Sequence, residues 1–140
     1  MFDKVLVAVD KSEQSDRAVA AARDLARMSA GAVRLLHVRE AQVAMGKGGG
    51  VFELEAPQDI ENLLEKEVAV FEEAGIPVTT ELRHAVIGRA AVEIVAAADE
   101  WGASLIVMGC RGRSELTSIV LGSTSYKVLH LANVPILVVR

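Results

Sequence analysis

Short apolar runs alternate with helix-length amphipathic segments along the whole chain, and this alternation constrains the fold more than any other feature. The apolar runs are rich in β-branched residues, which is typical of strands covered on both faces. Such an order specifies an α/β domain with a parallel sheet, and 140 residues suit one domain, 1–140. The predicted strands are 5–9, 33–38, 78–82, 105–108 and 135–139, and the predicted helices are 13–29, 58–74, 87–101 and 123–131.

Individual residues set the ends and faces of these helices. Ser12 is the expected N-cap of the first helix, and Gly31 is the residue expected to stop it. The inward face of the last helix is expected to carry Val128, Leu129 and Leu131. The last helix should therefore pack on the sheet through three large apolar side chains.

Composition argues against several classes of protein. The net charge is −4 and aromatic residues make up 4%, whereas nucleic-acid surfaces need clustered positive charge and stacking rings. A single cysteine, Cys110, excludes an internal disulfide framework and a multi-cysteine metal site. No apolar run approaches the ~20 residues that cross a bilayer, and the N-terminus lacks a signal-peptide pattern. We therefore expect a cytoplasmic protein with neither nucleic acid nor membrane as a partner.

Segment 40–57 lacks periodicity and includes a glycine-rich run, 46–50, that contains Lys47. A lysine among glycines suggests a phosphate-binding loop. This run, however, lacks the G-x-x-x-x-G-K-[ST] pattern, and no apolar helix follows it at once. Glycine-rich composition instead favours flexibility. The sequence therefore predicts a flexible loop across 40–57 within the single domain.

Glycines with a defined spacing follow the predicted strand 105–108. Gly109 and Gly112 are separated by two residues, and nine residues later Gly122 and Ser123 begin the last helix. Glycine lets the backbone approach a ligand closely, and a helix N-terminus offers free N–H groups and a positive dipole end to a phosphate. On spacing alone a second interpretation is equally open, in which the glycines shape a turn and Ser123 only caps the helix.

The spacing G-x2-G-x9-G-[ST] resembles the nucleotide-binding motif of the universal stress protein family. Residues 4–10 are also similar to the opening strand of that family and its terminal aspartate, and 105–109 and 135–140 to its fourth and fifth strands. The resemblance implies an open, parallel, five-stranded Rossmann-like sheet in the order 3-2-1-4-5, with helices on both faces. Asp10 and Gly109 should then meet in a crevice at the strand carboxyl ends, where such sheets bind ligands.

The resemblance also implies a ligand and the residues that bind it. The ligand would be ATP, or else AMP or cyclic AMP, with Mg²⁺ carried on the phosphates. Asp10 has a second interpretation, as a carboxylate that only caps the turn before the first helix. The implied binding residues are Ala8, Asp10, Val38, Met108 and Gly109 around the base and the floor, and Arg111, Gly112, Gly122, Ser123, Thr124 and Ser125 around the ribose and phosphates.

Three positions depart from the commonest family pattern. Lys11, Ser104 and Cys110 stand where a glycine, an aspartate and a serine are frequent, and none of them removes an implied phosphate contact. No catalytic residue is predicted, because no histidine stands with a serine or cysteine in a recognisable nucleophile motif. Any hydrolysis should be slow, and the hydroxyls of 123–125 are candidate phosphoryl acceptors. The protein is therefore not expected to be an efficient enzyme.

The last predicted strand is apolar and ends the chain at a sheet edge, which proteins usually protect by pairing. Two copies paired about a two-fold axis through 135–140 would protect it, and the resemblance implies the same homodimer. The expected function is that of a nucleotide-dependent regulator in a stress response, acting on an unidentified protein partner. Two alternatives are a dimerisation module of the same family that binds no nucleotide, and a cyclic AMP binder.

Overall fold

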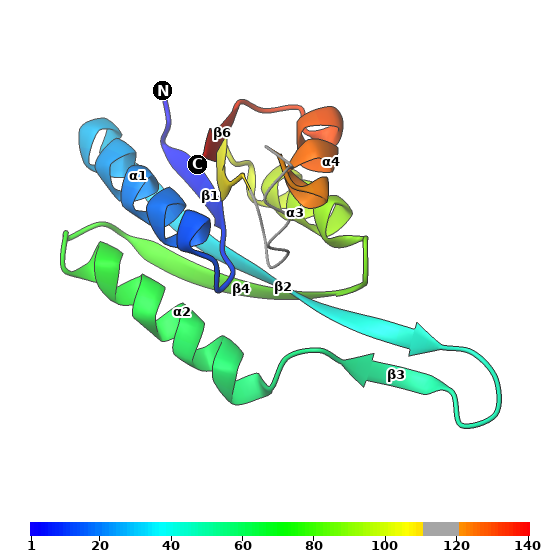
Figure 1. Ribbon diagram of the computed structural model, residues 1–140. Coiled ribbons are helices and arrows are strands. Elements are labelled where there is room, and N and C mark those ends of the chain that lie inside the picture. Colours follow the sequence, from blue (N-terminus) through cyan, green and yellow to red (C-terminus); the bar gives the residue numbers. More distant parts are fainter. Residues whose placement is uncertain (111–120) are drawn as a thin grey trace.

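The sheet lies between two layers of helices, with α1 and α2 on one face and α3 and α4 on the other (Figure 1). The computed structural model describes residues 1–110 and 121–140. The predicted alternation is confirmed, and two of the helices begin and end at the predicted residues. The elements are β1 (Lys4–Ala8), α1 (Glu13–Ser29), β2 (Ala32–Ala44), β3 (Gly50–Glu53), α2 (Pro57–Glu72), β4 (Val78–Val86), α3 (Ala90–Trp101), β5 (Leu105–Gly109), α4 (Ser123–Leu131) and β6 (Ile136–Val139).

Five of the strands are parallel and lie in the order β4-β2-β1-β5-β6. This is the expected order 3-2-1-4-5, with β4, β5 and β6 as the third, fourth and fifth strands. The additional strand, β3, pairs antiparallel with the end of β2, from Ala41 opposite Glu53 to Ala44 opposite Gly50. The expectation of a purely parallel, five-stranded sheet is therefore wrong. In the described part of the chain the sheet is mixed and has six strands.

Segment 40–57, predicted to be a loop, forms most of a β-hairpin. β2 is 13 residues long and continues to Ala44, well beyond its predicted end. The glycine-rich run supplies the turn to β3, with φ of +107° at Gly46 and +76° at Gly48. Glycine adopts these left-handed conformations without steric cost, which explains why the run is rich in it. The hairpin extends beyond the rest of the sheet (Figure 1).

β3 and β4 lie on opposite edges of β2. The carbonyl of Glu40 accepts a hydrogen bond from the N–H of Leu54 at 3.4 Å, on the side of β3. The carbonyl of the next residue, Ala41, accepts one from the N–H of Ile87 at 3.0 Å, on the side of β4. Successive carbonyls of a strand point to opposite sides, so β3 occupies the same edge of β2 as β1, past the carboxyl end of β1.

Alternate residues of the central strands contribute to two apolar cores. Val5 and Val7 of β1 pack with α1 and α2, whereas Leu6 packs with α3 and α4. All three are fully buried, so the near-continuous apolar sequence of this strand is explained by cover on both faces. Among the described residues, no helix is both long and apolar enough to span a bilayer.

The inward face of α4 differs from the predicted one. Val128 is fully buried as expected, but Leu129 and Leu131 are 44% and 48% exposed. The side chain that joins Val128 inside is Ser125, three residues earlier, which is 2% exposed. Positions i and i+3 share a helix face, whereas adjacent positions lie ~100° apart, so Val128 and Leu129 do not share one.

The ends of α1 are fixed by one residue that was predicted and one that was not. Ser12 is the N-cap, and its Oγ accepts a hydrogen bond from the N–H of Ser15 at 3.1 Å. At the other end the left-handed residue is Ala30, with φ of +51°, and not Gly31. A Cβ on Gly31 would lie 2.5 Å from the carbonyl oxygen of Phe2. That glycine is therefore required by close packing and not by backbone conformation.

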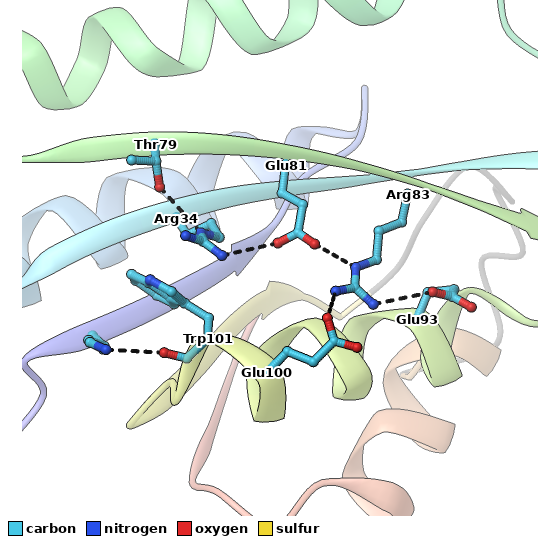
Figure 2. A network of polar contacts seen from close by, with 8 residues as sticks. Arg34, Thr79, Glu81, Arg83, Glu93, Glu100 and Trp101 are labelled. Atoms are coloured by element: carbon cyan, nitrogen blue, oxygen red, sulfur yellow. Dashed lines mark hydrogen bonds and ion pairs between the residues drawn. The ribbon is translucent and has the colours of Figure 1, made fainter.

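A set of ion pairs joins β4 to α3 on the outer flank of the sheet (Figure 2). We call Arg34, Glu81, Arg83, Glu93 and Glu100 the Arg83 cluster. Arg83 contacts all three carboxylates, and Glu81 also pairs with Arg34 at 3.4 Å. The hydrogen bond to Glu100, followed by that to Glu81, raises the pKa of the Arg83 guanidinium. The Arg83 guanidinium therefore keeps its charge at neutral pH.

One carboxyl lies in the contact between α1 and α2. Glu67 is 1% exposed, and its Oε1 is 3.6 Å from the Nζ of Lys66, which also pairs with Asp16 at 2.9 Å. Burial raises the pKa of Glu67 to about 7; the charge of Lys66 opposes this rise, and a hydrogen bond with Asp16 adds to it. Glu67 therefore changes its protonation state near neutral pH.

Candidate functional site

The carboxyl ends of β1, β2 and β5 and the N-terminus of α4 surround one cavity of about 310 Å³. β1 lies between β2 and β5, so the cavity is at the point where the strand order reverses. α/β sheets bind ligands at this point. Arg111 and Gly112 lie outside the described residues, and so does Arg113. The other predicted site residues all line the cavity: Ala8, Asp10, Val38, Met108, Gly109, Gly122, Ser123, Thr124 and Ser125.

The first turn of α4 presents backbone N–H groups to this cavity. Gly122 is the N-cap and provides no side chain to accept hydrogen bonds from the turn. The N–H groups of Ser123, Thr124 and Ser125 come before the first intrahelical bond, which the N–H of Tyr126 makes to Gly122 at 3.0 Å. The positive end of the helix dipole points the same way, so this wall is suited to an anion.

The hydroxyl of Ser125 has a structural role. Its Oγ donates a hydrogen bond to the carbonyl of Gly109 at 2.9 Å, and the residue is 2% exposed. The N–H of Gly122 adds a second link, to the carbonyl of Cys110, at 2.6 Å. Together these bonds hold the start of α4 against the end of β5, and they leave the hydroxyls of Ser123 and Thr124 as the ones nearer to solvent.

Gly109 is required by the packing of α1. A Cβ at this position would lie 2.8 Å from the Cβ of Gln14 and 2.9 Å from its carbonyl carbon. Real Cβ atoms do not approach backbone so closely, so the helix would have to move away from β5. The close approach that the sequence indicated at Gly109 is therefore, in part, an approach to the protein's own first helix.

Asp10 has the capping role that the sequence left open, and it also lines the cavity. Its Oδ1 accepts a hydrogen bond from the N–H of Ser12 at 2.7 Å, which closes the turn between β1 and α1. Its own N–H donates to the Oγ of Ser15 at 2.9 Å. The turn that carries Asp10 is thereby fixed from both sides.

A buried histidine–glutamate pair beside Asp10 was not predicted. His37 and Glu55 both line the cavity and are 3% and 7% exposed. The Nε2 of His37 lies 3.0 Å from each carboxylate oxygen, and its Nδ1 lies 2.7 Å from the carbonyl oxygen of Val9. A histidine in an apolar strand signals that two buried nitrogens need partners. The partner itself depends on the hairpin, which the sequence did not reveal.

A second missed feature is the turn between β4 and α3. Ile87 and Gly88 line the cavity, and Gly88 has a left-handed φ of +86°. The N–H of Gly88 donates to the Oε2 of Glu40 at 3.0 Å, and its carbonyl accepts from the Nζ of Lys127 at 3.0 Å. A glycine shortly after the end of a strand was the available signal. The turn is therefore held by charged side chains from both β2 and α4.

Ionisable side chains in the described cavity wall come from the ends of β1 and β2 and from the segment after β3. They are Asp10, His37, Glu40 and Glu55. Within residues 1–110 and 121–140, no group of three or more His, Cys, Asp or Glu side chains could hold a metal ion. The cavity thus combines an acidic wall with a wall of N–H groups at α4.

Known proteins match this chain over its whole length. A sequence model of the Universal stress protein family matches residues 1–140. Universal stress protein YxiE of Bacillus subtilis is 38% identical over 153 residues, with each chain fully covered. The structure of the universal stress protein from Archaeoglobus fulgidus in complex with dAMP has a TM-score of 0.68 at 25% identity, over 100% of both chains.

A further solved structure, of a universal stress protein in complex with cAMP, has a TM-score of 0.70 at 26% identity. It covers 99% of this chain and 97% of its own. The likeness in sequence and in fold extends from the first strand to the last, as the glycine spacing indicated. The chain belongs to the universal stress protein family.

Proposed function

We propose that this protein binds an adenine nucleotide, ATP above all, in the cavity at the strand carboxyl ends. The observation that carries the proposal is that two walls of different chemistry line the same cavity. The unpaired N–H groups of the first turn of α4 line the same cavity as the apolar side chains of Ala8, Val38 and Met108. One wall suits phosphates and the other suits a flat apolar base.

The dimensions and the solved relatives support this assignment. A cavity of about 310 Å³ falls at the lower end of the ~300–1,000 Å³ that small-molecule sites occupy. The relatives in complex with dAMP and with cAMP have the same fold over nearly their whole length. Asp10 and the backbone of Val38 would face the base and ribose, and Ser123 and Thr124 would face the phosphates. Mg²⁺ would be bound through phosphate oxygens.

The bound nucleotide would regulate the protein and would not be hydrolysed rapidly. In the described cavity wall two of the carboxylates already accept protein hydrogen bonds, Asp10 from Ser12 and Glu40 from Gly88. Hydrolysis would therefore be slow, since a general base needs a free position next to the attacking water. We further propose a cytoplasmic homodimer paired through β6, the strand at the sheet edge.

The test is to identify the nucleotide that copurifies with the protein by mass spectrometry and to titrate ATP, AMP and cyclic AMP by calorimetry. Ser123→Asp places a carboxylate at the exposed first turn of α4. We expect about tenfold weaker ATP binding or worse, because like charges ~4 Å apart repel by ~1–4 kcal/mol. The fold should be unharmed, since a carboxylate at a helix N-terminus is stabilising. Gln58→Glu, which adds the same charge to the first turn of α2, is the matched control.

Three other outcomes would change the assignment. Equal ATP affinity in Ser123→Asp and Gln58→Glu would place the phosphates away from α4. Binding of cyclic AMP alone would favour a cyclic nucleotide sensor. A folded protein that binds none of the three nucleotides would leave a dimerisation module as the function, with Gly109 retained for the packing of α1.

A further inference from the structure

The buried pair of His37 and Glu55 is not needed to explain a nucleotide pocket. Both residues are almost fully excluded from water, at 3% and 7% exposure, although each is polar. Removing a charged pair from water is unfavourable unless its hydrogen bonds compensate, and apolar residues of the same size often do as well. A pair in such a place is therefore a candidate for a specific role.

Hydrogen bonds hold the ring of His37 on both sides. The carbonyl oxygen of Val9 only accepts hydrogen bonds, so the Nδ1 of His37, 2.7 Å away, carries a hydrogen. The Nε2 lies at the same 3.0 Å from both oxygens of Glu55. His37 therefore donates from Nδ1 to the end of β1, and its Nε2 contacts both carboxyl oxygens of Glu55.

The two sides of the ring contact two different parts of the molecule. Val9 directly precedes Asp10, so the bond from Nδ1 holds the end of β1 where it forms the cavity wall. Glu55 follows the hairpin strand β3, so the bond from Nε2 holds the base of the hairpin. The ring of His37, on β2, lies between them and contacts both.

Arg39 completes the attachment of the hairpin base to β2. Its guanidinium donates to the carbonyl of Glu55 at 2.7 Å, and its Nε is 3.1 Å from the carboxylate of Glu53. The second contact is ionic and not a directed hydrogen bond. In these contacts Arg39 binds the hairpin base, whereas His37 contacts both the hairpin base and the end of β1.

We propose that His37 is a positioning residue that couples the docking of the β2–β3 hairpin to the nucleotide affinity of the cavity. The inference rests on the proposed function. A docked hairpin fixes Glu55, Glu55 fixes the ring of His37, and the ring fixes the backbone beside Asp10. Because coupling between two sites is reciprocal, a bound nucleotide holds the hairpin more firmly, and displacement of the hairpin releases the nucleotide. The hairpin is therefore the regulatory element of the site.

The first test removes the charge of Glu55 and keeps its size. In Glu55→Gln we expect ATP affinity measured by calorimetry to fall by about tenfold, within the ~5- to 150-fold range of coupled sites. Glu61→Gln removes the same charge from an exposed position on α2 and should bind ATP as the natural protein does. Equal ATP affinity in the two variants would overturn the coupling.

The second test uses the unaltered protein and so does not depend on how well a variant folds. Hydrogen exchange of the amides in 41–54 should slow when ATP is added, and ¹⁵N spectra should show hydrogen on the Nδ1 of His37. Hairpin exchange that ATP leaves unchanged, or an Nδ1 without hydrogen, would overturn the inference. If the unaltered protein binds no ATP at all, the proposed function fails, which is a different result from binding without coupling.

Discussion

The His37–Glu55 pair and the Arg83 cluster both join separate segments of the chain, but the pair is buried and the cluster is partly exposed to water. Each joins a long strand to a neighbouring segment, the pair at the cavity and the cluster on the outer flank (Figure 2). The side chains of the pair are 3% and 4% exposed, whereas those of Glu93 and Glu100 in the cluster are 33% and 67% exposed. Water can replace a lost partner in the cluster but not in the pair.

This difference in exposure shows in which of the two places water can take the role of a lost polar partner. Exposed ion pairs contribute ~0–1 kcal/mol, and the cluster adds redundancy because Arg83 has several carboxylates around it. A buried pair gains little over apolar residues, but removing one member is strongly destabilising, because water cannot take its place. The His37–Glu55 contact should therefore be harder to replace than any single contact of the Arg83 cluster.

The largest effect is expected from His37→Ala. It removes the ring that contacts the buried carboxyl of Glu55, and the free energy of unfolding should fall by about 3–5 kcal/mol in urea titrations. The double variant His37→Leu, Glu55→Leu is the control, since it removes both polar side chains and should recover much of the loss. A loss below ~1 kcal/mol in the single variant would place the pair in the same class as the exposed cluster.

A pH-dependent effect of intermediate size is expected from Glu67. Its pKa is raised from 4.5 to about 7 in the folded protein, so between these values the folded state keeps a proton that the unfolded state has released. Stability should therefore fall as pH rises through this window, by up to ~1.4 kcal/mol per unit, and level off above it. Urea unfolding across the window measures the slope.

The matched variant for this titration is Glu67→Gln. It carries no titrating proton at this position, so its unfolding free energy should lack the slope and exceed that of the natural protein above the window. Glu65→Gln, an exposed glutamate on the same helix, should retain the slope. A slope that survives in Glu67→Gln would assign it to another group.

The smallest effect is expected from Glu93→Gln in the Arg83 cluster. Glu93 is 3.5 Å from Arg83, and its side chain is one-third exposed. Arg83 keeps its other carboxylates, so the unfolding free energy should change by no more than ~1 kcal/mol, and raised salt should shrink the difference. A larger change would mean that the cluster behaves as a buried network, which would remove the contrast with His37.

The sequence predicted those parts of the fold that depend on local pattern. The bounds of α1 and α4 follow from apolar periodicity and from Ser12 and Gly122 at their starts. The inward face of α4 was predicted wrongly, because the bond from Ser125 to Gly109 helps to set the rotation of the helix. That bond joins residues far apart in the chain, and periodicity contains no information about it.

The same limit applies to the cavity. Its glycines and hydroxyls were predictable because their spacing along the chain is itself the signal. His37 and Glu55 are 18 residues apart, and their contact exists only because a hairpin brings the chain back along β2. The glycine run 46–50 was interpreted through its composition as a loop, whereas its left-handed residues form the turn of that hairpin.

The open tip of the hairpin has a practical consequence. Met45 is 93% exposed, and a Cβ on Gly46 or Gly48 would meet no atom within 4 Å. Chain segments of this kind accept inserted residues, because lengthening them adds little closure entropy and displaces no neighbour. A fluorophore on Lys47, or a short peptide tag inserted beside it, would sit well away from the bonds of His37. The tip is therefore a place to attach an optical reporter of ligand occupancy while leaving the cavity itself unaltered.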